Sequence, residues 1–165
     1  MRRAFVASLI ALTAPSVAIA ADGNDYGAHV YQRCAACHLP NGQGVPGAFP
    51  ALAGRLAAAA ATDGGRDYMV MAVSAGLMGE IDVDGKKIRG VMPAQAGLTD
   101  ADIAAVLNYA VALKGADARP PKVAAKAFTP EEVAAIRARF PNTNPNAVHA
   151  IRSSAFPPAD GAVEK

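Results

Sequence analysis

The stretch Cys34-Ala35-Ala36-Cys37-His38 decides how the rest of this chain is interpreted. It contains both cysteines of the sequence and one of its three histidines. Two thiols separated by two residues and followed at once by an imidazole are typical of covalent attachment of a c-type haem. Each thiol would add across one vinyl group of the macrocycle, and His38 would bind the iron as the proximal axial ligand. We therefore predict one covalently bound haem c.

Three other uses of a Cys-x-x-Cys pair fit this sequence less well. A redox dithiol of the thioredoxin type favours a strand–helix–strand context and needs no histidine after the second cysteine. A zinc site needs two further ligands, but only His29 and His149 remain as histidines and there is no second cysteine pair. A disulfide across two intervening residues would be strained.

The first 20 residues have the three parts of a secretory signal. Arg2 and Arg3 form the charged start, an apolar run extends from about residue 4 to 17, and Ala18-Ile19-Ala20 is a small-x-small cleavage site. An uncleaved membrane anchor is the alternative, although the run is short for a span of about 20 residues. We expect cleavage before Ala21 and a periplasmic protein without stable membrane insertion.

Composition supports a cofactor-centred interior and argues against nucleic-acid binding. Hydrophobic residues make up 52% of the 165, but aromatic residues make up only 5% and tryptophan is absent. Such a core is poor in bulky groups, and a haem would supply the missing apolar mass. Without Arg2 and Arg3 the chain has 14 basic and 14 acidic residues and no basic run, so nucleic acid is not an expected partner.

Periodicity and breaker residues predict a mostly helical chain with one small hairpin. A first helix should start at Asp25, acting as its cap, and run to about Cys37, whereas Asp63-Gly64-Gly65 should stop a short alanine-rich helix. The segment 77–81 should leave the next helix as a loop. The expected elements are helices over 25–37, 56–62, 67–76 and 98–113, and a hairpin over 81–88 turning at Asp84-Gly85.

The chain beyond Gly115 changes character. Residues 116–127 contain two prolines, lysines and small residues and should form a linker. Phe128-Thr129-Pro130-Glu131-Glu132-Val133 combines the features of a helix start, and a second short helix should follow Asn144-Pro145. We predict that Val133, Ile136 and Phe140 face inward on the first of these helices, with Val148 and Ile151 inward on the second, and that residues 155–165 are loose.

Met92 is the candidate for the second axial ligand. Pro93 restricts the backbone beside it, so an irregular segment could present the thioether rigidly. Met78, expected in the loop after a helix, is its competitor. Met69 and Met71 fall on a predicted helix, where filling of the core is the favoured interpretation.

Taken together, these residues resemble the class I monohaem cytochromes c of bacteria over about residues 25–115. The resemblance rests on Gly27 and Tyr31, the Cys34–His38 motif, the stretch from Phe49 to Gly54, Met92-Pro93-Ala94 and the closing helix. It implies an all-α cytochrome c fold around one haem, with the first and last helices crossing at Gly27 and Tyr109. It also implies that His38 donates to the Pro50 carbonyl and that Arg55 binds a haem propionate.

The resemblance implies three segments and an electron carrier rather than an enzyme. Residues 1–20 would be the signal, 21–115 the cytochrome domain, and 116–165 an extension that wraps the domain or contacts a partner. The extension looks like that of cytochrome subunits of periplasmic dehydrogenases, so a dehydrogenase would be the donor and an oxidase or another cytochrome the acceptor. A haem enzyme or gas sensor with a labile sixth ligand, and a structural role in a complex, are the alternatives.

Overall fold

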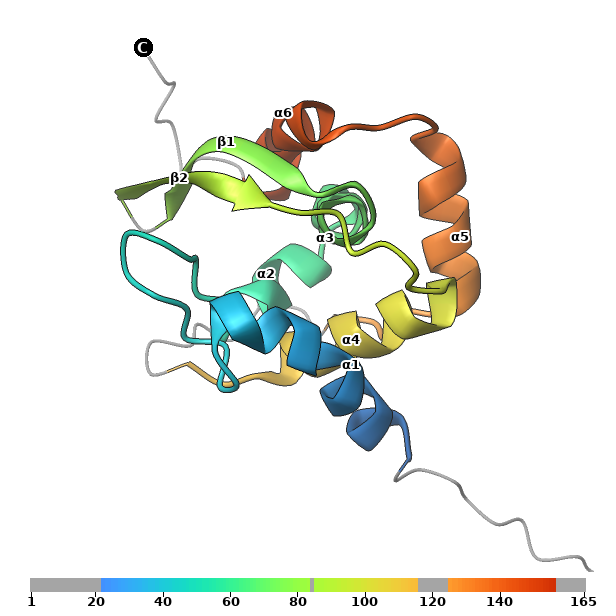
Figure 1. Cartoon of the computed structure of the whole chain (residues 1–165). Coiled ribbons are helices and arrows are strands. Elements are labelled where there is room, and N and C mark those ends of the chain that lie inside the picture. The colour runs from blue at the N-terminus through green and yellow to red at the C-terminus, as the bar shows by residue number, and fades with distance from the viewer. Residues whose placement is uncertain (1–21, 84, 116–124, 157–165) are drawn as a thin grey trace, which may run out of the picture.

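The computed structural model describes residues 22–83, 85–115 and 125–156, which form helices arranged around a two-stranded ribbon (Figure 1). The predicted predominance of helix is confirmed. None of the described helices is long and apolar enough to cross a membrane. The elements are α1 (Asp22–His38), α2 (Leu56–Ala60), α3 (Asp63–Ala75), β1 (Leu77–Val83), β2 (Lys86–Met92), α4 (Asp100–Ala112), α5 (Pro130–Arg139) and α6 (Pro145–Ala155).

Helices α1 and α4 cross at Gly27, as expected. A Cβ atom on Gly27 would lie 2.5 Å from the Ala105 carbonyl oxygen and 2.9 Å from Tyr109 Cβ, so a larger residue would push the helices apart. The rings of Tyr31 and Tyr109 are 5.1 Å apart beside this crossing. Helix α1 already runs from Asp22, so the prediction that Asp25 caps it is wrong.

Helix α4 begins within two residues of the start of the helix predicted over 98–113, and Thr99 caps it. The Thr99 hydroxyl accepts a hydrogen bond from the Asp102 amide, and the Asp102 carboxylate accepts one from the Thr99 amide at 2.8 Å. This capping box satisfies two backbone donors that have no partner inside the helix. The helix then buries Ile103 and Leu107, which are 2% and 4% exposed.

The glycines at the start of α3 have a different role from the predicted one. They do not stop α2; Thr62 caps α3, and its hydroxyl accepts a hydrogen bond from the Gly65 amide at 3.1 Å. A Cβ atom on Gly65 would lie 1.9 Å from the Ala59 carbonyl oxygen. Gly65 therefore allows α2 and α3 to pack backbone against backbone.

The hairpin is longer than predicted at both ends. Strands β1 and β2 pair antiparallel from Leu77 opposite Met92 to Val83 opposite Lys86. Residues 77–81 are therefore strand, not the loop that we expected. Because side chains alternate along a strand, Leu77, Ile81 and Ile88 are buried on one face. Gly85 lies in the turn with φ +73°, whereas Asp84 is outside the described residues.

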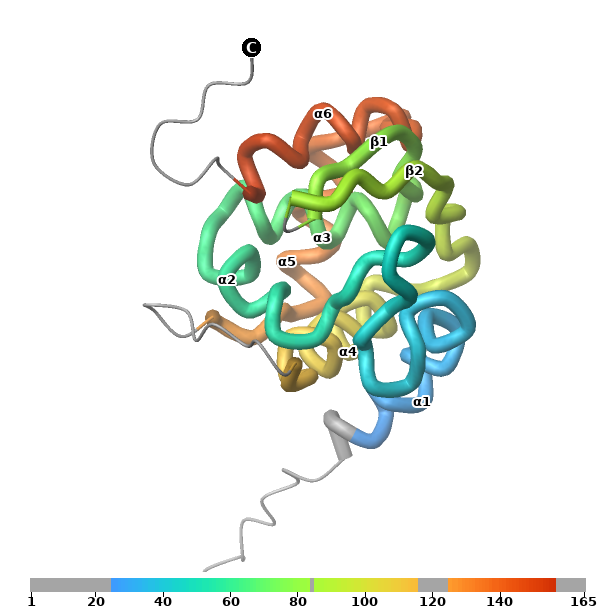
Figure 2. Tube along the Cα trace, turned by 90° about the vertical axis from the view of Figure 1, so that its left-hand side faces the viewer, coloured from blue at the N-terminus to red at the C-terminus, as the bar shows by residue number. Residues whose placement is uncertain are grey.

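Helices α5 and α6 fold back onto the rest of the chain (Figures 1 and 2). Helix α5 packs on α4 and α3, and α6 packs on α3 and β1. Thr129 caps α5 with Pro130 in the first turn, and Asn144 caps α6 with Pro145, as predicted. Val133 and Val148 are fully buried. The expected signal, most of the linker and residues 157–165 of the expected loose tail lie outside the described residues. Ala155 is the last residue of α6 and is 4% exposed, so the prediction that it is loose is wrong.

The buried side chain of Arg66 on α3 binds α5, which Arg139 also joins to α3 through an ion pair with Asp67. Arg66 donates to both carboxylate oxygens of Glu132, at 2.5 and 2.6 Å. Its remaining donors bind backbone carbonyl oxygens, and its guanidinium carbon lies 3.8 Å from the centre of the Phe128 ring. All five donors of an arginine are therefore used. The carbonyl acceptors belong to Ala60, Lys126 and Ala127.

Candidate haem-binding site

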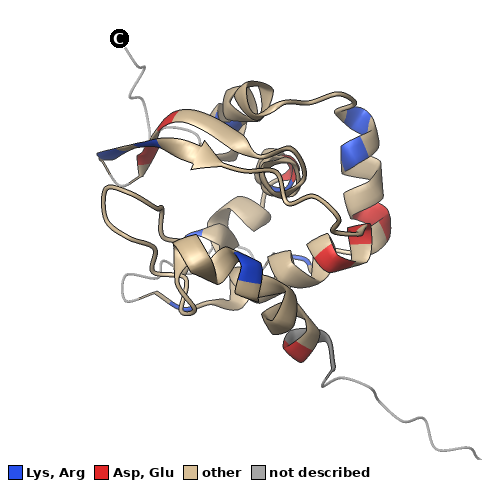
Figure 3. Ribbon diagram, in the orientation of Figure 1, with Lys and Arg blue, Asp and Glu red and all other residues tan. Residues whose placement is uncertain are grey.

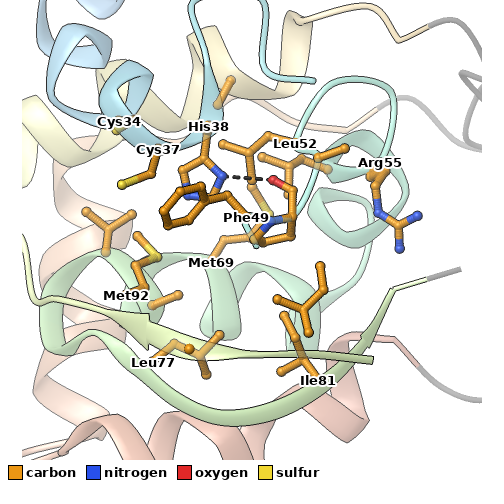
Figure 4. Close-up of a pocket in the computed structure, with 18 of the residues that line it drawn as sticks. Cys34, Cys37, His38, Phe49, Leu52, Arg55, Met69, Leu77, Ile81 and Met92 are labelled. Carbon is orange, nitrogen blue, oxygen red and sulfur yellow. Dashed lines mark hydrogen bonds between the residues drawn. The ribbon is translucent and has the colours of Figure 1, made fainter. Parts of the chain in front are cut away.

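A cavity of about 380 Å³ lies between the end of α1, the loop after it, α3 and the hairpin (Figure 4). Its volume falls within the range of about 300–1,000 Å³ that small-molecule and cofactor sites occupy. Most of its wall is apolar side chain, and the apolar faces of α3 and β1 form its floor. The apolar lining includes Leu52, Leu56, Ala72, Val73, Leu77, Ile81, Val83, Ile88, Val106 and Leu107.

Both cysteines lie in the wall of this cavity, on the last turn of α1. Residues three apart on a helix share a face, so Cys34 and Cys37 present their thiols to the same side. Both thiols are free and half-buried rather than joined in a disulfide. Burial raises the pKa of the Cys34 thiol. The two sulfurs are therefore available for addition to a molecule in the cavity.

His38 follows the thiols into the cavity in a fixed orientation. Its Nδ1 lies 2.9 Å from the Pro50 carbonyl oxygen, which can only accept, so Nδ1 carries the proton. Burial lowers the pKa of His38, and the bond to Pro50 opposes this effect. The ring is 6% exposed, and its other nitrogen points toward the cavity with its lone pair available (Figure 4). This is the arrangement in which an imidazole binds a metal.

The loop after α1 holds the Pro50 carbonyl in place. Gly44 has φ +65°, and a Cβ atom there would lie 2.6 Å from the Pro50 carbonyl oxygen. The Gly44 amide donates to the His38 carbonyl at 2.9 Å, and Val45 and Phe49 exchange backbone hydrogen bonds across a small bridge. The glycine therefore lets the loop fold back tightly enough for Pro50 to reach His38.

Met92 also lines the cavity, but from a regular element rather than the irregular segment that we expected. It is the last residue of β2 and pairs with Leu77. Gly76 ends α3 with φ +82°, and a Cβ atom there would lie 2.6 Å from the Met92 carbonyl oxygen. The Gln95 amide donates to the Val73 carbonyl at 2.9 Å. The end of β2 is therefore fixed against α3 on both sides of Met92.

Besides Met92, the methionine that lines the cavity is Met69 and not Met78, which we had considered as the alternative axial ligand. Met78 lies in β1, so its expected position in a loop is wrong. Its side chain is 40% exposed and does not line the cavity. Met69 is 3% exposed and belongs to the buried core, as predicted, and it also lines the cavity from α3 (Figure 4). The period of α3 places Met69 and Val73 on one face, a signal that the sequence contained.

Polar side chains are few along the wall, and one comes from an unexpected place. Arg55 lines the cavity on the side away from the cysteines, as Figure 4 shows, so the predicted propionate partner is within the site. Arg152 of α6 lines it as well, together with Tyr68 and Phe156. Sequence reasoning missed Arg152, although its spacing from Val148 and Ala155 places it on the buried face of α6.

These residues fit a flat apolar macrocycle that carries a metal. Two free thiols, an imidazole nitrogen and a thioether face an apolar space, and thioether and imidazole are haem ligands. In the described part of the chain, no three His, Cys, Asp or Glu side chains gather to hold a bare metal ion. His149, the partner considered for zinc, lies against the Glu80 carbonyl oxygen at 2.6 Å.

Comparison with known proteins identifies the family. The family model described as Cytochrome c matches residues 25–114. Cytochrome c-552 of Thermus thermophilus is 50% identical over 113 residues, which cover 68% of this chain and 85% of that protein. A second cytochrome c-552, from a named strain of the same species, has the same identity over 75% of its length. The chain therefore belongs to the cytochrome c family, whose members bind haem c covalently and carry electrons.

Proposed function

We propose that this protein is a periplasmic electron carrier with one haem c held by Cys34, Cys37, His38 and Met92. When bound, the haem c supplies an iron that cycles between Fe(III) and Fe(II). The observation that carries the proposal is the convergence of these four side chains on one apolar cavity. The donor would be a periplasmic dehydrogenase, and the acceptor a terminal oxidase or another cytochrome.

The side chains would favour electron transfer over chemistry at the metal. If His38 and Met92 both held the iron of a bound haem, they would leave no open position on it for a substrate. A thioether ligand and apolar burial raise the reduction potential. The Pro50 carbonyl fixes the His38 ring and increases the basicity of its second nitrogen. The rigid setting of Met92 between β1 and α3 would keep the thioether in place in both oxidation states.

Electrons would enter and leave through the rim of the cavity. Phe49 and Val91 line the cavity and are 39% and 60% exposed, so apolar surface continues from the site to solvent. Figure 3 shows charged residues at the tip of the hairpin and along α5, with mostly uncharged ribbon between them. An exposed, partly apolar rim would suit the small, short-lived interfaces of redox partners.

The weak far-red absorption band of a sulfur-to-iron bond in the ferric protein tests this assignment. We expect the band in the wild type and in Met78→Leu, because Met78 faces away from the cavity. It should persist in Met69→Leu and disappear in Met92→Ala. Loss of the band in Met69→Leu with retention in Met92→Ala would contradict the assignment. A ferric spectrum without the band in the wild type would favour a haem enzyme or sensor with a labile ligand.

A further inference from the structure

Arg152 of α6 reaches the cavity with unused hydrogen-bond donors. Its Nη2 donates to the Asp82 carbonyl oxygen at 2.7 Å, and its Nη1 donates to the Tyr68 hydroxyl at 3.2 Å. The guanidinium carbon lies 4.5 Å from the centre of the Phe156 ring. An arginine has five N–H donors, so three have no acceptor in the described part of the chain. These contacts fix the position of the guanidinium but leave some of its N–H donors without an acceptor among the described residues.

Tyr68 adds a second donor at the same corner. Its side chain is buried on α3, at 7% exposure, and its hydroxyl oxygen accepts from Arg152. Burial raises the pKa of Tyr68, so the phenol keeps its proton at neutral pH. That proton is donated to no acceptor among the described residues. A buried hydroxyl and a partly exposed guanidinium, each with donors to spare, therefore lie together at one corner of the cavity, where an entering oxygen acceptor could bind both.

The corner lies at the end of the cavity away from the thiols. Figure 4 shows Cys34 and Cys37 on one side and Arg55 and Ile81 on the other, and the carbonyl that holds Arg152 belongs to the residue after Ile81. In iron protoporphyrin the vinyl groups and the two propionates lie on opposite edges of the ring. A macrocycle bonded to the two thiols would therefore turn its carboxylates toward Arg152.

The charged groups around the cavity are complementary to such carboxylates. Arg33, Arg55 and Arg152 line it from α1, the start of α2 and α6, and no Asp or Glu lines it among the described residues. The other ionisable groups in the wall are His38, Tyr68 and the two thiols, together with Tyr31. The Asp82 carboxylate accepts a hydrogen bond from the Gly85 amide in the hairpin turn instead.

We propose that Arg152 and Tyr68 form a subsite for a carboxylate of the macrocycle, so that the C-terminal extension completes the cofactor cavity. This inference rests on the proposed function, because it requires a haem attached at Cys34 and Cys37. Arginine–carboxylate pairs are among the strongest hydrogen bonds that proteins form. Arg152 lies outside the matched family domain, residues 25–114, so the extension adds a binding residue to Arg55 and Tyr68, which lie within that domain.

The pH profile of the midpoint reduction potential of the intact holoprotein tests the subsite. The compared proteins are the wild type, Arg152→Gln, Arg152→Lys, Tyr68→Phe and the control Arg137→Gln, whose side chain pairs with Asp100 on the surface. We expect the pH-dependent segment to move to higher pH in Arg152→Gln, because the carboxylate loses its cation. The shift should be smaller in Arg152→Lys and Tyr68→Phe, and absent in Arg137→Gln.

The outcomes separate this inference from the proposed function. Failure of the wild type to carry a covalent haem by mass would overturn the proposed function and the subsite with it. A covalent haem with the same pH profile in the wild type and Arg152→Gln would overturn the subsite alone, even if Arg152→Gln were less heat-stable. A profile that changes between acetate and chloride media would show that free anions occupy the corner, which also contradicts the proposal.

Discussion

The two halves of the molecule are held together by different means. The cavity half, formed by the end of α1, the loop with Pro50 and the hairpin, surrounds an apolar cavity, and the hydrogen bond from His38 to Pro50 joins its helix to its loop. The extension half, α5 and α6, is tied to α3, α4 and β1 by buried apolar residues and ion pairs. The side chains of the first half that line the cavity therefore depend on a ligand to cover them, although the hairpin also packs on α6. The second half is covered by its own side chains.

Preventing haem attachment should produce the largest difference in stability between the two halves. In the double variant Cys34→Ser, Cys37→Ser we expect no covalent haem and loss of most ordered structure around the cavity, because the apolar walls lose what fills them. Hydrogen exchange resolved by peptide should show fast exchange in the loop and the hairpin. Protection in α3 and α5 should fall less. Equal protection of every peptide in the variant and the wild type would contradict this comparison.

Breaking the Arg66–Glu132 pair should affect the extension half next most strongly. Arg66→Met leaves the Glu132 carboxylate and several carbonyls without their donor, and we expect a loss of roughly 3 kcal/mol of unfolding free energy. The Glu132 side chain is 28% exposed, which keeps the loss at the lower end for buried pairs. Chemical denaturation measures the loss. Arg137→Gln, which breaks an exposed pair on the same helix, should cost less than about 1 kcal/mol.

Enlarging Gly27 should disturb the crossing that supports the cavity half. The added methyl group of Gly27→Ala would meet the Ala105 carbonyl oxygen at 2.5 Å, so α1 and α4 must shift. We expect a loss of about 1–3 kcal/mol, typical of overpacking, despite the better helix propensity of alanine. Gly85→Ala is the matched control for space, since nothing lies within 4 Å of its added Cβ, although φ +73° adds strain there. A more stable Gly27→Ala protein by thermal denaturation would contradict the structure.

Acid should weaken the extension half through Glu132. The hydrogen bonds and charge of Arg66 hold the pKa of Glu132 below its usual range. A carboxyl group with a lowered pKa in the folded state stabilises the protein above its unfolded pKa of about 4.3. That stabilisation is lost as the pH falls through the lower folded value. Unfolding free energies between pH 6 and about pH 3 should therefore fall less steeply in Glu132→Gln than in the wild type.

Local signals in the sequence predicted much of the helical structure. The capping box at Thr99 and the side chains of Thr129 and Asn144 each accept hydrogen bonds from backbone amides two or three residues ahead, so neighbouring residues suffice to place these helix starts. The same holds for the thiols and His38, because their spacing alone gives them a common face. The crossing at Gly27 was predicted from the family resemblance, because neighbouring residues in the sequence do not explain why a glycine lies within a helix.

The errors arose where distant contacts decide the structure. Gly65 was expected to break a helix, but its role comes from the Ala59 backbone packed against it. The hairpin extends to Met92, and its strand β1 packs on α6, a contact between distant segments that no local propensity shows. Arg152 and Met69 were missed as cavity residues because helical period predicts which face is buried, but not which neighbour or cavity that face meets.

The most direct test of the central claim is the intact mass of the mature protein under denaturing conditions, measured together with its absorption spectrum. The account predicts a mass larger than that of the polypeptide by one haem, and a Soret band that stays with the polypeptide after acid extraction. It predicts that the change of Cys34 and Cys37 to serine removes both. A mature protein with the mass of the bare polypeptide and no Soret band would contradict the account.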